Sequence, residues 1–252
     1  MKNKFLLLGI ALASLTACKT VSAPSLVNVK TQKNISINNE LKNDEAFVKV
    51  IEPYKQKLDK EMNQKISHTS VDLTKQGNNS NLGNLLADYT FEGGNDWLQA
   101  HLKQNADAAL INIGGIRTTI GKGDIFLKNL FEVMPFENEL IIVKMKGTDL
   151  QALFDYYAKT QVNNPVSHLY IETKNGQLSK SLINGKTPEP NKDYYIATSD
   201  YLALGGDNMK FFAKGEAIPT GVKLRDLYIE YFKKNPEIVP ATDVRLNFIG
   251  KK

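Results

Sequence analysis

Few side chains in this sequence could perform hydrolysis or hold a catalytic metal. There are three histidines, His68, His101 and His168, and a single cysteine, Cys18. None of the metal-ligand motifs H-E-x-x-H, D-x-H, G-N-H or G-H-x-H occurs, and no G-x-S-x-G motif provides a serine nucleophile. We therefore expect this chain to contain no metal centre and no catalytic nucleophile of its own.

Four segments that combine small, polar and aromatic residues stand out instead. They are residues 81–88 (NLGNLLAD), 107–117 (DAALINIGGIR), 133–138 (VMPFEN) and 201–207 (YLALGGD). The glycine pair before Asp207 would let the backbone approach a ligand closely. Each segment alone is a weak signal, but all four in this order make a strong one.

In this order and spacing the segments resemble the carboxy-terminal domain of 5′-nucleotidases, a family that includes UDP-sugar hydrolases and 2′,3′-cyclic nucleotide phosphodiesterases. The resemblance covers residues 45–250. In that family an amino-terminal metallophosphatase domain holds two metals with the histidine motifs that are absent here. The resemblance thus implies a nucleotide-binding half alone, with no cofactor of its own and with divalent metals only in a partner phosphatase chain.

The resemblance also implies a nucleotide pocket. Phe136 and Tyr201 would stack on the base, Asp207 would accept hydrogen bonds from the ribose hydroxyls, and Asn112 and Arg117 would flank the Gly-Gly turn. The planar guanidinium of Arg117 suits bidentate contact with a phosphate. The alternative is that these residues are core aromatics, a turn aspartate and a surface arginine.

Three positions depart from the family pattern. Ile113 replaces the first glycine of the usual Asn-Gly-Gly-Gly-Ile-Arg, and Gln76 stands where some members have a phosphate-binding arginine. Asn208 follows Asp207 in place of glycine. Each change would weaken phosphate binding more than base stacking.

The elements that must position these residues follow from periodicity and turn signals. We expect helices over residues 45–62, from 81 with an interruption at Gly93-Gly94 before 97–102, over 127–133, from 148 to 157 and over 222–232. We expect strands over 66–73, 108–111, 139–145, 194–198 and 244–248, with a glycine-rich loop over 112–123. The mixture lacks strict βαβ alternation, which favours a single α+β domain with a mixed β-sheet and flanking helices.

Local signals suggest caps and turns. Ser80 or Asn81 is expected to cap the second helix, and Thr148 the fourth. The pairs Asn175-Gly176 and Asn184-Gly185 are hairpin signals and together predict a β-meander.

The first residues are typical of a secretion signal. The apolar run from Phe5 to Leu15 follows two lysines and is about eleven residues long, whereas a membrane-spanning helix needs roughly twenty. Leu15-Thr16-Ala17-Cys18 resembles a lipobox, so we expect a signal peptide over 1–17, a lipidated tether over 18–44 starting at Cys18, and the domain over 45–252. The lipid would anchor the chain in a membrane of the cell envelope, facing the periplasm or the surface. The alternative is a cleaved signal with an incidental cysteine.

Composition limits the possible partners. The 32 Lys and Arg against 27 Asp and Glu give a net charge of only +5, too little to indicate nucleic acid binding. One cysteine also excludes an internal disulfide. The favoured hypothesis is the substrate-binding half of a split 5′-nucleotidase, working with a separately encoded metallophosphatase subunit. The alternatives are a non-catalytic nucleotide- or nucleoside-binding module and a degenerate structural lipoprotein without a ligand.

Overall fold

The computed structural model describes residues 28–38 and 41–250. The predicted signal peptide and Cys18 lie outside these residues. Residues 28–38 and 41–44 contain no helix or strand. Within the described part of the chain, no helix has both the length and the apolar character needed to cross a bilayer.

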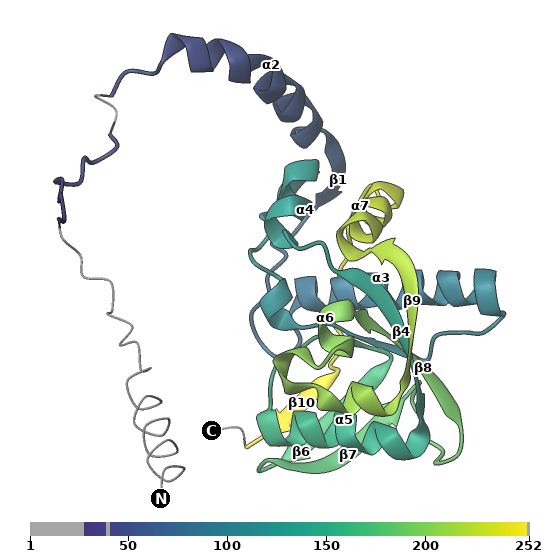
Figure 1. The fold of residues 1–252 in the computed structure, drawn as a ribbon. Helices are drawn as coiled ribbons and strands as arrows, with labels where there is room; N and C mark the ends of the chain where they lie inside the picture. The colour runs from purple at the N-terminus through teal and green to yellow at the C-terminus, as the bar shows by residue number, and fades with distance from the viewer. Residues whose placement is uncertain (1–27, 39–40, 251–252) are drawn as a thin grey trace, which may run out of the picture. The chain divides into compact units, whose positions relative to one another are not determined.

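The domain mixes helices with mixed β-sheets, which confirms the predicted α+β class (Figure 1). The α-helices are α2 (Glu45–Met62), α3 (Asn81–Leu102), α4 (Leu127–Val133), α5 (Gly147–Thr160), α6 (Asp200–Ala203) and α7 (Leu224–Lys234). The strands are β1 (Lys65–Thr69), β2 (Ala108–Leu110), β3 (Gly123–Phe126), β4 (Glu139–Lys146), β5 (Val166–Ser167), β6 (Leu169–Lys174), β7 (Gln177–Ile183), β8 (Asp193–Ser199), β9 (Glu216–Lys223) and β10 (Leu246–Ile249). Short 3₁₀ helices are η2 (Ile113–Gly115), η3 (Gly206–Asn208) and η4 (Lys210–Lys214).

The central sheet has five strands in the order β5-β2-β8-β4-β9. Strand β8 lies in its middle, parallel to β2 and antiparallel to β4. A three-stranded sheet, β10-β6-β7, and the antiparallel pair β1-β3 complete the described strands. The central sheet is therefore mixed, and its middle strand joins segments that are far apart in the sequence.

Side chains of the central sheet point alternately into two hydrophobic cores. Along β4, Leu140 and Ile142 belong to the first core, which also contains residues of α3, α4 and α7. Ile141 and Val143 belong to the second, which contains residues of α5 and of the three-stranded sheet. This alternation is the period of two that an extended strand imposes. The sheet is thus covered on both faces.

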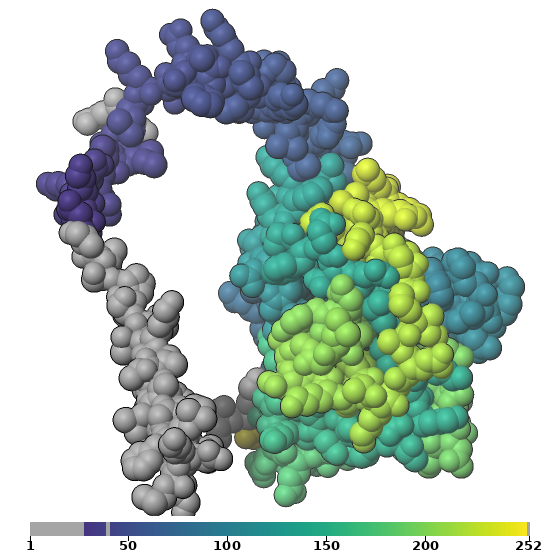
Figure 2. Space-filling view, in the orientation of Figure 1, coloured from purple at the N-terminus to yellow at the C-terminus, as the bar shows by residue number. Residues whose placement is uncertain are grey.

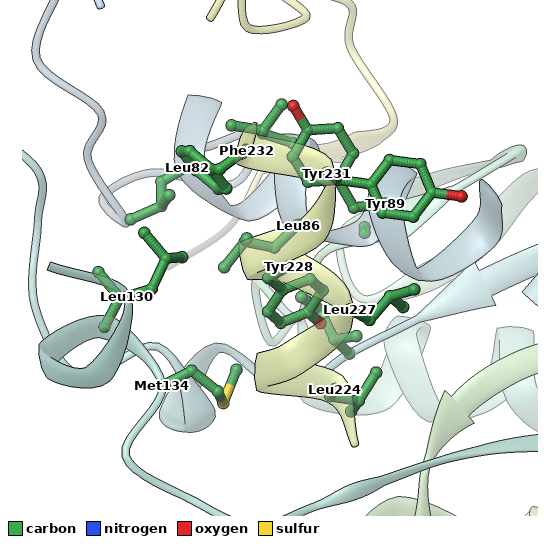
Figure 3. Close-up of a cluster of buried hydrophobic side chains, with 14 of the residues drawn as sticks. Leu82, Leu86, Tyr89, Leu130, Met134, Leu224, Leu227, Tyr228, Tyr231 and Phe232 are labelled. Carbon is green, nitrogen blue, oxygen red and sulfur yellow. The ribbon is translucent and has the colours of Figure 1, made fainter. Parts of the chain in front are cut away.

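Helix α7 packs into the first core along one side. Its buried residues are Leu224, Leu227, Tyr228, Tyr231 and Phe232. Figure 3 shows them pointing toward labelled side chains of α3 and α4. These residues recur at helical spacing and form one buried face, against which Ile229 adds a partly buried contact with the same core.

Helix α3 runs without interruption from residue 81 to residue 102, so the predicted break at Gly93-Gly94 was wrong. Both glycines are buried. A Cβ on Gly93 would lie 2.5 Å from a methyl group of Leu227, and one on Gly94 would lie 2.7 Å from the Cβ of Ala197. The glycines allow α3 to lie close to α7 and β8, and this packing outweighs their poor helix propensity.

The cap predictions were right for the position of Ser80 and wrong for Thr148. Ser80 is the N-cap residue of α3 but makes no side-chain cap hydrogen bond, and the Oδ1 of Asn81 accepts instead from the backbone N–H of Thr74 at 2.7 Å. Helix α5 begins at Gly147 with Lys146 as its N-cap, which places Thr148 inside the first turn. The Asn81 side chain therefore fixes the preceding loop rather than the helix end.

Strand predictions succeeded in part. Asn175-Gly176 connects the antiparallel strands β6 and β7, as expected. Asn184-Gly185 closes only an isolated bridge, because the next strand, β8, pairs with β2 and β4 in the other sheet, so the β-meander was wrong. The strand predicted over 66–73 ends at Thr69. The closing strand begins at Leu246, two residues later than predicted, and neither β3 nor β9 was predicted.

A buried arginine ties strand β10 to helix α3. The guanidinium of Arg245 donates to both carboxylate oxygens of Asp88, at 2.7 and 2.8 Å, and to those of Asp243, at 2.9 and 3.0 Å. It also donates to the carbonyl oxygens of Asn84 and Val166. A buried charge needs such complete pairing, so this cluster fixes β10 against α3 and β5.

The first core predicts a large cost for truncation. We expect Leu86→Ala, at a fully buried position of α3, to lower the free energy of unfolding by about 2–5 kcal/mol, because it leaves a cavity. Leu58→Ala on the exposed face of α2 is the matched control, with an expected change within about 0.5 kcal/mol. Urea unfolding measures both, and equal effects would contradict the assignment of the core.

The arginine cluster predicts a pH dependence. The Arg245 guanidinium holds the pKa of Asp243 below its ordinary value, so this stabilisation is present above the unfolded pKa of about 3.9 and is lost as the pH falls through the lower folded value. We expect Arg245→Gln to cost about 3–5 kcal/mol at pH 7, since it leaves carboxylates without their partner.

The deficit of Arg245→Gln should narrow below about pH 4. Urea unfolding at pH 7 and pH 3.5 measures this change. Lys65→Gln, which breaks the exposed pair with Asp124, is the control and should cost less than about 1 kcal/mol. A deficit of equal size at both pH values would contradict the role given to Asp243.

Candidate functional site

The candidate site lies at one edge of the central sheet. Since β8 is parallel to β2 and antiparallel to β4, the ends of β2 and β8 and the start of β4 meet at this edge. Asn112 and Arg117 follow β2, Phe136 precedes β4, and Tyr201 and Asp207 follow β8. Strand order thus brings together side chains that are up to 95 positions apart in the numbering, 207 − 112.

A cleft of about 400 Å³ opens at this edge. Its lining residues are Asn112, Gly114, Gly115, Arg117, Phe136, Asn138, Tyr201 and Asp207. All five side chains named from the sequence are among them; whether they bind a ligand stays a prediction. In the space-filling view, the light-green segment that follows β8 lies at the surface of the domain (Figure 2).

The two aromatic residues of the cleft are unlike the core aromatics. Phe136 is 41% exposed and Tyr201 is 44% exposed, whereas Phe154 and Tyr228 are fully buried. An aromatic ring that stays in contact with water does not gain the free energy of burying its apolar surface, and a ligand that covers the ring would gain it. The alternative interpretation of Phe136 and Tyr201 as core residues is therefore wrong.

Tyr201 and Asp207 form one hydrogen-bonded unit. The Tyr201 hydroxyl donates to Asp207 Oδ1 at 2.8 Å and accepts from the backbone N–H of Asp207 at 3.2 Å. The hydroxyl of Tyr156, on α5, donates to the Asp207 carbonyl oxygen at 3.0 Å. The hydrogen bond to the Asp207 carboxylate raises the pKa of the Tyr201 hydroxyl above its ordinary value.

The glycines beside this unit have a steric purpose. A Cβ on Gly206 would lie 2.6 Å from Cε1 and Cζ of the Tyr201 ring and from the Tyr201 carbonyl oxygen. Gly205 has φ of 93°, a conformation that favours glycine. Asp207 itself has φ of 51°, so its backbone is held in the left-handed region by the contacts around it.

The loop after β2 presents Arg117 to the cleft. Its Nη1 donates to the carbonyl oxygen of Gly114 at 3.1 Å, and its guanidinium lies over the ring of Phe136, 5.8 Å from the ring centroid. Asn112 precedes the 3₁₀ helix η2, and its side chain lies against Gly115, where a Cβ would be 2.9 Å from Asn112 Oδ1. Ile113 fits into this loop, and its N–H donates to Asn164 Oδ1 at 2.9 Å.

The segment containing Phe136 is fixed by the start of α7. Arg225 donates to the carbonyl oxygens of Met134 and Phe136 and pairs with Glu137. Its guanidinium lies 4.4 Å from the centroid of the Phe131 ring. The position of Phe136 therefore depends on Arg225, a residue 89 positions later in the sequence (225 − 136).

Two neighbours of the cleft had no predicted role. Asn138 lines the cleft, and its Nδ2 donates to Asp200 Oδ1 at 2.7 Å, which leaves its amide oxygen as a candidate polar contact. Lys75, beside the departure at Gln76, donates from Nζ to the carbonyl oxygen of Ile116 at 2.6 Å. Asn138 is the last residue of the segment 133–138, and its place in that segment could have indicated a role in the cleft. Nothing in the local sequence distinguished Lys75 from the other lysines.

The three histidines lie apart. His68 pairs with Glu237, His101 stacks on Trp97, and His168 stacks on the ring of Phe91 with a centroid distance of 3.7 Å. Burial lowers the pKa of His168, so its ring is mainly neutral at pH 7. Among the described residues, no group of three His, Cys, Asp or Glu side chains could hold a metal ion.

Comparison with known proteins gives consistent matches. The family model for the 5′-nucleotidase C-terminal domain matches residues 62–214. A 5′-nucleotidase of Vibrio vulnificus (strain CMCP6) is 28% identical over 223 residues, covering 84% of this chain and 38% of the relative. A 5′-nucleotidase precursor from Thermus thermophilus has a TM-score of 0.67 at 24% identity, covering 83% of this chain and 44% of that structure.

A second solved structure, the NAD nucleotidase of Haemophilus influenzae, has a TM-score of 0.62 at 21% identity and covers 88% of this chain and 44% of its own. Likeness at these identities shows a shared fold. This chain spans less than half the length of each of these three proteins.

The close contact at Gly206 predicts the effect of adding one methyl group. We expect Gly206→Ala to displace the Tyr201 ring and to separate its hydroxyl from Asp207, because the new Cβ would overlap the ring. A crystal structure of the variant measures both changes. Gly121→Ala, where nothing lies within 4 Å of the new Cβ, is the control. An unmoved ring with its hydrogen bond intact would contradict the steric role of Gly206.

Proposed function

The chain belongs to the 5′-nucleotidase family through a C-terminal-type domain, and from this premise we propose that its cleft binds a nucleotide or nucleoside. One observation supports the proposal above all others: Asn112, Arg117, Phe136, Tyr201 and Asp207 line the same cleft. The family resemblance implied these five residues, and strand order brings them together independently of it.

The cleft offers a different chemistry to each part of a nucleotide. The exposed rings of Phe136 and Tyr201 suit a flat base, and base–aromatic stacking contributes about 1–3 kcal/mol for each ring. The Asp207 carboxylate suits ribose hydroxyls, and the Arg117 guanidinium suits a phosphate. With Arg117 and Asp207 both present, the cleft has no large excess of one charge, so base stacking is expected to contribute most of the affinity.

We further propose that this chain is the substrate-binding half of a split 5′-nucleotidase. The matched relatives are more than twice as long as the part that this chain covers, and two of the three named above are called 5′-nucleotidases. The histidine motifs of a two-metal centre do not occur in this sequence. A separate metallophosphatase chain would supply the divalent metals and the attacking water, while this chain holds the phosphoester in place.

We also propose that the chain acts at the cell envelope. The support is the apolar leader with the lipobox-like sequence that ends at Cys18, which would receive the lipid. A tether of about 27 residues, 44 − 17, would follow the signal peptide. Such a tether would hold the domain off the membrane, where it could meet a second protein.

Calorimetry tests the binding proposal. We expect the purified chain to bind AMP or UMP, and Phe136→Ala to weaken binding by about 1–3 kcal/mol through the loss of one stacked ring. Phe47→Ala, at an exposed position that is not among the residues lining the cleft, is the matched control and should leave the affinity unchanged. Equal affinities of the Phe136→Ala variant and the unaltered chain would show that the ligand site lies elsewhere.

Reconstitution tests the split-enzyme proposal. A pulldown with the full chain from its own membrane fraction should recover a metallophosphatase, and the mixture should release phosphate from AMP in the presence of Mn²⁺. Either protein alone should release much less, and Arg117→Ala should reduce the rate of the mixture. Phosphate release that is the same with and without this chain would argue for a binding module without a part in hydrolysis.

A further inference from the structure

We propose that the Tyr201 hydroxyl is a positioning group that holds the Asp207 carboxylate ready to receive sugar hydroxyls, and that it thereby sets the preference of the cleft for ribose over hydroxyl-free sugars. The inference rests on the proposed nucleotide binding and adds a second role for Tyr201. Its ring would stack on a base, and its hydroxyl would determine which sugar is accepted.

The geometry separates these two roles. The hydroxyl is bonded twice to one residue, donating to Asp207 Oδ1 at 2.8 Å and accepting from Asp207 N at 3.2 Å. This double contact links the carboxylate to its own backbone through the phenol. The hydroxyl has used its one donor, so it recognises no ligand acceptor itself. The ring remains open to the cleft, since Tyr201 as a whole is 44% exposed and lines it.

Asp207 needs such support. It lies in the short 3₁₀ helix η3 at an exposed position, and its φ of 51° places its backbone in the left-handed region. The Tyr156 hydroxyl fixes its carbonyl oxygen, at 3.0 Å, but leaves the carboxylate unaffected. Without the Tyr201 hydroxyl, the carboxylate of an exposed aspartate would turn among its rotamers.

The carboxylate retains acceptor capacity for a ligand. A carboxylate has about four lone-pair sites, and the Tyr201 hydroxyl occupies one of them on Oδ1. Oδ2 therefore remains for a hydroxyl from outside. A sugar with hydroxyl groups can donate there, and a 2′,3′-dideoxy sugar cannot. Because the acceptor is already fixed in place, little conformational entropy is lost when the sugar binds.

The test compares AMP with 2′,3′-dideoxy-AMP by calorimetry on the full chain. We expect AMP to bind about tenfold or more tightly, since hydrogen bonds to a charged acceptor are strong. Tyr201→Phe keeps the ring, so its affinity for the dideoxy analogue should stay within about twofold while the preference for AMP falls to about threefold or less. Tyr195→Phe, which removes a phenol hydroxyl outside the cleft lining, should keep the full preference.

A double-mutant cycle distinguishes positioning from a general structural effect. Asp207→Ala should abolish the preference, and adding Tyr201→Phe to it should then change nothing further, because the hydroxyl acts through the carboxylate. Independent, additive losses would overturn the inference. So would an unchanged preference in Tyr201→Phe, or a higher one, which would mean that the hydroxyl competes with the sugar.

The failures are distinguishable. If neither AMP nor its dideoxy analogue binds the unaltered chain, the proposed function fails and this inference fails with it. If both bind and the Tyr201→Phe variant keeps the same ratio of affinities, only the inference about the hydroxyl fails.

Discussion

The pairing of β8 with β2 on one side and β4 on the other is the constraint on which the site depends. The Ala108–Ile196 pairing is parallel and the Leu140–Ser199 pairing is antiparallel. Only this combination places two strand ends and one strand start at the same edge. Hydrogen bonds between neighbouring strands allow no gradual displacement, because a shift by one residue would turn every side chain to the opposite face. The cleft therefore inherits its geometry from the sheet.

Around this edge, each wall of the cleft is held by a different part of the fold. Arg225 of α7 fixes the segment of Phe136, the Tyr156 hydroxyl of α5 fixes Asp207, and the Lys75 ammonium fixes the loop before Arg117. Helices α7 and α5 lie in different cores, on opposite faces of the central sheet. The supports of the cleft therefore come from both layers of the domain.

Local sequence predicted those elements whose structure is decided locally. The ends of α2 and α4 agree with the prediction, and the side chains of Asp44 and Asn129 that bond to the backbone at their starts are close in sequence. The unbroken α3 could not be predicted, since Gly93 and Gly94 pack against residues more than 100 positions away. Strand β9 was missed because Pro219 interrupts its pattern, and proline is tolerated there only because β9 is an edge strand. The five cleft residues were found through family motifs, but their mutual contacts, above all the Tyr201–Asp207 bond, arise only after the loop closes.

The guanidinium of Arg117 over Phe136 affects how any affinity for the cleft should be understood. The planar guanidinium shields part of the exposed Phe136 ring from solvent in the absence of a ligand. If a flat ligand group displaces the guanidinium from the ring, the net gain in binding free energy is the difference between the two stacking interactions. It is smaller than the full stacking energy of the ligand group. The Phe136 ring therefore leaves less apolar surface in contact with water than its exposed position alone would suggest.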